Sequence, residues 1–167
     1  MPLLPPLFMD LQARGWEYEL RTHPTRNLSL IGSYTHFRNR DPNNVQFRGV
    51  AERAGGLLAS YAFARDHVPA LDGFRLAIGV DHLAKRPGDS TPGFTAAANP
   101  VPNQPTFYLD ARTLVNLTLA SESKQHWGAQ VNVDHVFDQE YFLSSAGRGA
   151  AFPGPPRNVR VSLKYGF

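Results

Sequence analysis

The side chains that could carry chemistry are spread thinly along this sequence. Its histidines show none of the close spacings, such as H-x-x-x-H, that bring imidazoles together on one metal ion. Cysteine is absent, which excludes disulfides, thiolate metal sites and a cysteine nucleophile. We therefore predict no metal site and no cofactor, with the histidines in turns and at strand ends. The histidines are His23, His36, His67, His82, His126 and His135.

One short cluster could imitate an acid–base pair. Asp134, His135 and Asp138 are close in sequence, and a carboxylate beside an imidazole can transfer protons. Asp134 and His135 are neighbours in a predicted strand, however, where successive side chains point to opposite faces. Ser144-Ser145-Ala146-Gly147 lacks the G-x-S-x-G nucleophile pattern, and Gly147-Arg148-Gly149 lacks the lysine and spacing of a phosphate loop. We predict that the protein is not an enzyme.

Composition is consistent with one domain built from strands. The chain has 167 residues, 42% of them hydrophobic and 11% aromatic, with 14 glycines and 14 prolines. A net charge of +3 without any long basic run argues against nucleic acid as a partner. No stretch reaches the roughly 18 consecutive apolar residues of a membrane helix. The first residues also lack the basic region and uninterrupted apolar core of a signal peptide.

Seven segments alternate between apolar and polar residues, the period of a strand with two different faces. In the last one, Val159, Val161, Leu163, Tyr165 and Phe167 share a face opposite polar or small residues. The pattern predicts an all-β, antiparallel meander of about seven strands. The predicted strands cover residues 15–21, 27–37, 56–64, 74–83, 106–120, 125–136 and 157–167.

The connections between these segments alternate in length. Short links at 22–26, 65–73 and 121–124 alternate with long links at 38–55, 84–105 and 138–156. Outer-membrane barrels have short turns on one side, long loops on the other and tilted strands of about ten residues. We therefore favour membrane-spanning strands. The alternative is a small soluble β-barrel or sandwich that points its apolar face inward and binds an apolar ligand.

Residues 131–142 resemble a segment near the C-terminus of TonB-dependent outer-membrane receptors, especially the siderophore class. The family pattern NV-x-N-L-F-D-x-x-Y is matched at Asn132, Val133, Phe137, Asp138 and Tyr141. His135 stands where the family usually has asparagine, so the local geometry at the outer rim is expected to differ. Further segments resemble the family in the same order. They are residues 15–20, 33–35, 60–63, 71–80 and 85–90, together with Gly154 to Arg157 (which includes Pro156) and the terminal Phe167.

This resemblance implies a barrel of about 22 strands with an N-terminal plug domain inside it. Such receptors bind ferric siderophores at the outer face of the Gram-negative outer membrane and import them with energy from the TonB system. The chain is then a C-terminal barrel segment covering residues 13–167, without the plug, preceded by a loop or non-native leader at 1–12. The implied partners are outer-membrane lipid, the barrel-assembly machinery and, for the full-length parent, a ferric siderophore and TonB.

Two kinds of functional residue follow. The alternating strand end resembles the signal read by the barrel-assembly machinery, so we assign that role to Leu163, Tyr165 and Phe167. No family motif identifies the residues that contact a ligand, and haem, cobalamin or a glycan could replace the siderophore as substrate. A non-functional truncated gene product and a structural barrel without transport also remain open. The aromatic and arginine residues expected in loops or at the rim are Phe37, Arg38, Arg40, Phe47, Arg48, Phe94, Phe107, Tyr108 and Phe152.

Overall fold

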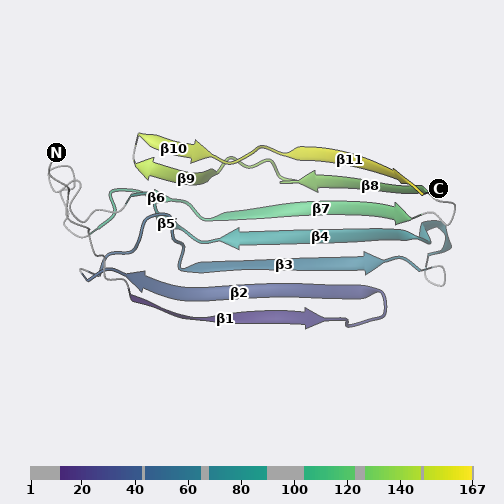
Figure 1. The fold of residues 1–167 in the computed structure, drawn as a ribbon, viewed down its shortest axis with the longest axis horizontal. Helices are drawn as coiled ribbons and strands as arrows, with labels where there is room; N and C mark the ends of the chain where they lie inside the picture. The colour runs from purple at the N-terminus through teal and green to yellow at the C-terminus, as the bar shows by residue number, and fades with distance from the viewer. Residues whose placement is uncertain are drawn as a thin grey trace.

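The computed structural model describes residues 12–42, 44–64, 68–89, 104–122, 127–147 and 149–166. Its main feature is one seven-stranded sheet in the order β1-β2-β3-β4-β7-β8-β11 (Figure 1). Every neighbouring pair is antiparallel, which confirms the predicted meander. The strands of the sheet are β1 (Gln12–Thr22), β2 (Leu28–Arg40), β3 (Arg53–Ala62), β4 (Phe74–Leu83), β7 (Arg112–Glu122), β8 (Trp127–Asp134) and β11 (Asn158–Tyr165).

The two ends of the sheet differ as the link lengths predict. The connections after β1, β3 and β7 are short and lie at one end, and a 3₁₀ helix, η1 (Pro69–Leu71), occupies the second of them. The long connections lie at the other end, on the left in Figure 1. They contain two small hairpins that the sequence pattern did not reveal, β5 (Arg86–Pro87) with β6 (Tyr108–Leu109), and β9 (Phe142–Gly147) with β10 (Ala150–Pro153).

The predicted fifth strand, at 106–120, is wrong at its start. Residues 108–109 belong to β6 and pair with Arg86 and Pro87, whereas the strand of the main sheet begins at Arg112. The alternation of apolar and polar residues continues across this break. Periodicity alone could therefore not show that the chain changes its partner strand.

The register places most apolar residues of the seven strands on one face. Directly paired residues share a face, and the pairs Leu57↔Val80 and Val131↔Val161 continue that face across the sheet. The opposite face carries mostly polar and small residues, and Ile31 lies there beside Leu58. The apolar face includes Trp16, Tyr18, Leu20, Leu28, Leu30, Tyr34, Leu57, Ala59, Tyr61, Phe74, Leu76, Ile78, Val80, Val115, Leu117, Leu119, Trp127, Ala129, Val131, Val133, Val159, Val161, Leu163 and Tyr165.

Aromatic rings lie toward both ends of this apolar face. Trp16 contacts Tyr34 at 5.4 Å between ring centroids, toward the long connections. Trp127 contacts Tyr165 at 4.6 Å, toward the short ones. Aliphatic side chains fill the region between them. Membrane barrels show the same sequence of rings, aliphatic band and rings along their outer face.

No described segment packs over either face of the sheet. Leu163 on the apolar face is 74% exposed, and Leu58 on the opposite face is 42% exposed. Among the described residues, no helix is long and apolar enough to span a membrane. The buried side chains instead lie in the long connections and at the adjoining strand ends: Asn39, Asp41, Val45, Ala51, Arg86, Pro87, Leu109 and His135.

Candidate functional site

Three excursions from the long-connection end of the sheet pack against one another, and we call them the loop cluster. The first is the β2–β3 loop, residues 41–52. The second is the β5–β6 hairpin with its described neighbours, 84–89 and 104–111. The third comprises the described part of 135–157, including the β9–β10 hairpin. Because these segments contain most of the buried side chains among the described residues, the loop cluster is the packed core of the part of the chain that the structure describes.

Side-chain acceptors hold the first excursion in place. Asp41 Oδ1 accepts the Val45 N–H at 2.7 Å, and Asn39 Oδ1 accepts the Phe47 N–H at 2.9 Å. Asn39 and Asp41 are almost fully buried. A buried N–H without an acceptor is costly, so these two side chains satisfy donors that no strand partner reaches.

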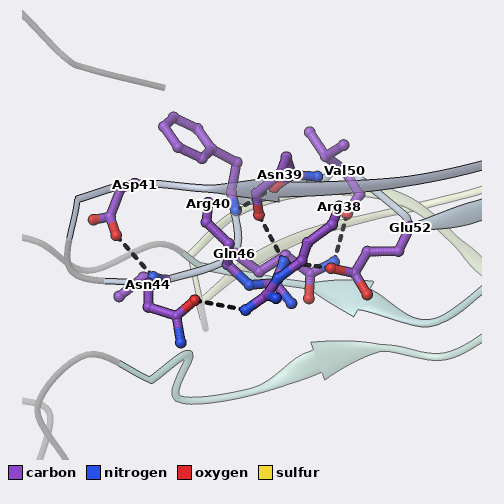
Figure 2. Close-up of polar contacts among 10 residues, drawn as sticks. Arg38, Asn39, Arg40, Asp41, Asn44, Gln46, Val50 and Glu52 are labelled. Atoms are coloured by element: carbon purple, nitrogen blue, oxygen red, sulfur yellow. Dashed lines mark hydrogen bonds and ion pairs between the residues drawn. The ribbon is translucent and has the colours of Figure 1, made fainter. Parts of the chain in front are cut away.

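Two arginines at the end of β2 point toward this loop (Figure 2). Arg38 Nη2 donates to Asn44 Oδ1 at 2.8 Å, and Arg40 forms an ion pair with Glu52. Both arginines and Arg14 line a hollow of about 320 Å³, which the remaining lining residues complete. These are Gln12, Asp41, Pro42 and Asn44.

Hydrogen bonds join the three excursions. The Gly49 N–H donates to Pro87 O at 2.9 Å, which ties the first excursion to the second. Arg48 Nη1 donates to Ala146 O at 3.3 Å, which ties the first to the third. These contacts link the first excursion to each of the other two.

Arg86 fastens the second excursion to the third. Its Nη2 donates to Phe142 O and to Leu143 O, both at 2.9 Å. Burial and the neighbouring Arg112 guanidinium lower the pKa of Arg86 below the usual arginine range. Arg112 lies 4.9 Å from the centre of the Tyr141 ring, and the ring face favours a cation. The sequence alone did not reveal this arginine pair, because it depends on contacts between distant loops.

The segment that carries the family motif is a turn in left-handed backbone. His135 has φ of 58° and Asp138 has φ of 51°, a conformation that aspartate and asparagine adopt more readily than most residues. Asp138 Oδ1 accepts the Arg157 N–H at 2.7 Å, and its other oxygen lies 3.6 Å from the Arg157 guanidinium. Asn116 Oδ1 accepts the His135 N–H at 2.8 Å. The usual family asparagine at position 135 therefore matches the backbone that His135 adopts here.

The His135 ring is part of the turn. Its Nε2 accepts the Gln139 N–H at 3.0 Å, so the proton of a neutral ring lies on Nδ1, which faces Pro155 O at 3.3 Å. The ring meets Tyr141 edge to face at 5.2 Å. Tyr141 in turn covers Gly154, where an added Cβ would lie 2.0 Å from the Tyr141 ring.

The other motif residues have separate positions. Asn132 Oδ1 accepts hydrogen bonds from the Thr118 hydroxyl and from Gln130. Val133 lies on the apolar face, and Phe137 is 65% exposed. Pro156 borders a cavity of about 620 Å³ that is lined by residues of the third excursion.

The loop and rim candidates gather at the long-connection end. Phe47 and Arg48 belong to the first excursion, and Phe37, Arg38 and Arg40 end β2. Phe107, Tyr108 and Phe152 belong to the two hairpins or their flanks, and Phe94 lies outside the described residues. Phe107 packs where a Cβ of Gly88 would stand, and the Lys85 ammonium lies 4.8 Å from the Tyr108 ring centre. The described candidates are therefore spread over the surface of the long-connection end of the sheet, and they do not all line one pocket.

The terminal strand presents Leu163 and Tyr165 on the apolar face, whereas Phe167 lies outside the described residues. His67 and His126 also lie outside them. Within the described ranges, no group of three or more metal-ligating side chains could hold a metal ion.

The fold and the loop cluster together define a class of protein. An antiparallel sheet with one apolar, aromatic-edged face, short turns at one end and packed polar loops at the other is the architecture of an outer-membrane barrel wall.

Comparison with known proteins gives the particular family. No family model matches the chain. The chain is 40% identical over 158 residues to the ferric-pyoverdine BN7/BN8 receptor of Pseudomonas putida, covering 95% of this chain and 17% of the receptor. The pyoverdine-bound outer-membrane receptor FpvA of Pseudomonas aeruginosa matches with a TM-score of 0.75 at 24% identity, over 95% of this chain and 22% of that one. FpvAI in complex with pyocin S2 also matches, with a TM-score of 0.75 at 23% identity, over 94% and 19%.

The chain is homologous to part of the TonB-dependent siderophore receptors, and its seven-stranded sheet matches part of their barrel. It spans about a fifth of the length of the curated relatives it matches. Those relatives are transport receptors and not enzymes. The matched structures include receptors bound to ferric pyoverdine or in complex with a pyocin. Homologous receptors lie in the outer membrane of Gram-negative bacteria.

Proposed function

We propose that residues 13–167 supply the last seven barrel strands and the adjoining outer loops of a TonB-dependent receptor for a ferric siderophore. The observation that carries this proposal is the 40% identity to a ferric-pyoverdine receptor along nearly the whole chain. The position at the end of the barrel follows from the resemblance of the segment around Asn132 to Tyr141. The leader or loop predicted at residues 1–12 would precede this segment in the sequence, although Gln12 already belongs to β1.

The loop cluster supports a role at the outer face. Its long connections are packed by Asp41, Asn39 and Arg86 instead of extending freely. A packed rim presents its exposed aromatic and basic residues in fixed positions, which lowers the ordering cost when a ligand binds. Phe137 and Phe152, both more than half exposed, are such residues. In the parent receptor, the polar face of the sheet would line the interior and the apolar face would meet lipid.

A chimeric receptor tests the proposal. The segment of the Pseudomonas putida receptor that aligns with this chain is replaced by it, in a host lacking that receptor, and uptake of ferric pyoverdine is measured. We expect the chimera to reach the outer membrane and to import ferric pyoverdine, with import lost and binding kept in a host without TonB.

Two controls separate the alternatives. A receptor lacking the aligned segment should neither assemble nor transport. An outer-membrane chimera that binds no ferric pyoverdine would support a structural barrel segment instead. A soluble, monomeric and cooperatively folding product from the chain expressed alone would favour the soluble module that binds an apolar ligand.

The end of β11 is proposed as the signal for the barrel-assembly machinery, through Leu163, Tyr165 and Phe167. In the chimera, replacing these three residues by serine should lower the amount of assembled receptor while its transcript is unchanged. Replacing Ser162 and Lys164, which lie on the opposite face, should leave the amount of assembled receptor unchanged. Equal assembly of both variants would contradict the assignment.

A further inference from the structure

Two arginines stand opposite each other at the outer end of the first two strands. Arg14 and Arg38 are directly paired across β1 and β2, and like charges in that position destabilise a sheet. Within the described residues, no carboxylate pairs with either guanidinium. Two acids of the β2–β3 loop have other partners: Glu52 pairs with Arg40, and Asp41 accepts the Val45 N–H. Arg14 and Arg38 are both exposed, so their guanidinium groups are accessible to an anion from outside the described chain.

The position of Arg14 and Arg38 on the sheet indicates which kind of anion could bind to them. The next pair along the same face is Trp16↔His36, whose rings stack at 5.4 Å with 14° between their planes. Beyond them the same face carries Leu20 and Leu57. The face therefore changes from aliphatic to aromatic to cationic toward the long connections. A membrane changes in the same order, from hydrocarbon through the interface to charged headgroups.

A hollow is available beside the two guanidinium groups. The space of about 320 Å³ is lined by Arg14, Arg38 and Arg40. Asn44 Oδ1 holds the Arg38 guanidinium from one side at 2.8 Å, which restricts its orientation (Figure 2). A guanidinium presents several N–H groups in one plane, the arrangement that matches phosphate oxygens.

We propose that Arg14 and Arg38 form a binding site for the anionic phosphate headgroup of a membrane lipid whose acyl chains lie along the apolar face. This inference rests on the proposed membrane insertion. Free inorganic phosphate shares the headgroup chemistry, but it would gain nothing from the neighbouring apolar face. The lipid is therefore the source to which the site is assigned.

The experiment uses the chimeric receptor, with every tryptophan outside this chain replaced by phenylalanine, reconstituted into phosphatidylcholine vesicles with increasing amounts of phosphatidic acid, because the isolated sheet would leave two unpaired edges in lipid. The chain has two tryptophans, so Trp127→Phe leaves Trp16 as a reporter beside the site. Trp16→Phe leaves Trp127 as a reporter at the other end of the sheet. We expect phosphatidic acid to change the Trp16 emission. The amount needed for half of that change should rise about fivefold for each arginine replaced by glutamine.

The matched control is Arg75→Gln, which removes the same charge from the polar face of β4. It should leave the Trp16 titration unchanged, and circular dichroism should show the same sheet content in every variant. Higher salt should weaken the response, because screening reduces attraction between exposed charges.

Each other outcome has a definite meaning. An unchanged titration in Arg14→Gln and Arg38→Gln overturns the inference while leaving membrane insertion intact. An equal Trp16 response to inorganic phosphate without the lipid overturns the assignment to a lipid. If neither tryptophan changes its emission with any vesicle, the proposed membrane insertion fails, and the lipid site fails with it.

Discussion

Asp138 provides the sharpest test of how the motif turn is held. Its carboxylate accepts the Arg157 N–H at 2.7 Å while its own backbone is left-handed, with φ of 51°. These two features can be separated by three substitutions. Asp138→Asn keeps an acceptor oxygen and tolerates the backbone, Asp138→Gly keeps only the backbone freedom, and Asp138→Ala keeps neither.

The expected magnitudes follow from the geometry. The ion pair between Asp138 and Arg157, at 3.6 Å with both side chains about half exposed, contributes little, so Asp138→Asn should cost at most about 1 kcal/mol. Losing the hydrogen bond in Asp138→Gly should cost about 1–2 kcal/mol. Asp138→Ala adds a left-handed backbone penalty of about 1–2 kcal/mol. Its total of roughly 2–4 kcal/mol corresponds to an increase in local opening of about 30-fold or more.

Hydrogen exchange of residues 135–157 in the chimeric receptor measures this opening directly. Asp134→Ala is the matched control, because Asp134 lies 3.6 Å from the Arg160 guanidinium within paired strands. It should change exchange by less than about fivefold. If Asp138→Asn opens the turn as much as Asp138→Ala, charge and not acceptor geometry holds it. If Asp138→Gly and Asp138→Ala are equal, the left-handed backbone carries no cost.

Three further substitutions test the turn, the third excursion and the membrane face. Gly154→Ala should expose the β9–β10 hairpin to protease, because an added Cβ would lie 2.0 Å from a packed ring, whereas Gly149→Ala meets nothing within 4 Å and should be neutral. Leu163→Arg on the apolar face should destabilise the barrel of the chimera by up to about 2–4 kcal/mol, the cost at mid-bilayer depth, and so reduce the amount of receptor assembled in the outer membrane. Ser162→Arg on the polar face should leave that amount unchanged. His135→Asn should open the turn less than His135→Val in hydrogen exchange, because asparagine tolerates the left-handed backbone and a β-branched residue does not.

The sequence predicted the sheet well because the signal was local. The predicted strand at 74–83 has the same limits as β4 (Phe74–Leu83), and alternation along each strand is enough to assign faces. Strands of two residues, such as the paired β5 and β6, are too short to leave a periodic signal in the sequence. They form because Arg86, Pro87 and Leu109 become buried against other loops, which is a tertiary effect.

In the candidate site, too, the sequence predicted what depends on local signals and missed what depends on tertiary contacts. The family resemblance identified Asp138, Tyr141 and Arg157 but not which side chains meet. The contacts of Asp138 with Arg157 and of Tyr141 with Arg112 form only after folding. The expectation that local geometry differs at position 135 did not foresee a left-handed backbone, with φ of 58°. Asparagine, the usual family residue at this position, adopts that backbone more readily than most residues. A single sequence shows the residue types, and the turn itself shows why they suit the position.

Strand direction limits how this sheet can be completed. β1 and β11 are the two edges of a seven-stranded antiparallel sheet, so they run in the same direction. If the sheet closed on itself, β11 would pair with β1 in parallel. A ring of identical sheets would have the same parallel junction between β11 of one copy and β1 of the next. Barrels built entirely from antiparallel strands contain no such junction. A closed antiparallel barrel that contains this sheet needs an odd number of further strands. In lipid, each unpaired edge group costs several kcal/mol, so β1 and β11 are where those further strands would pair.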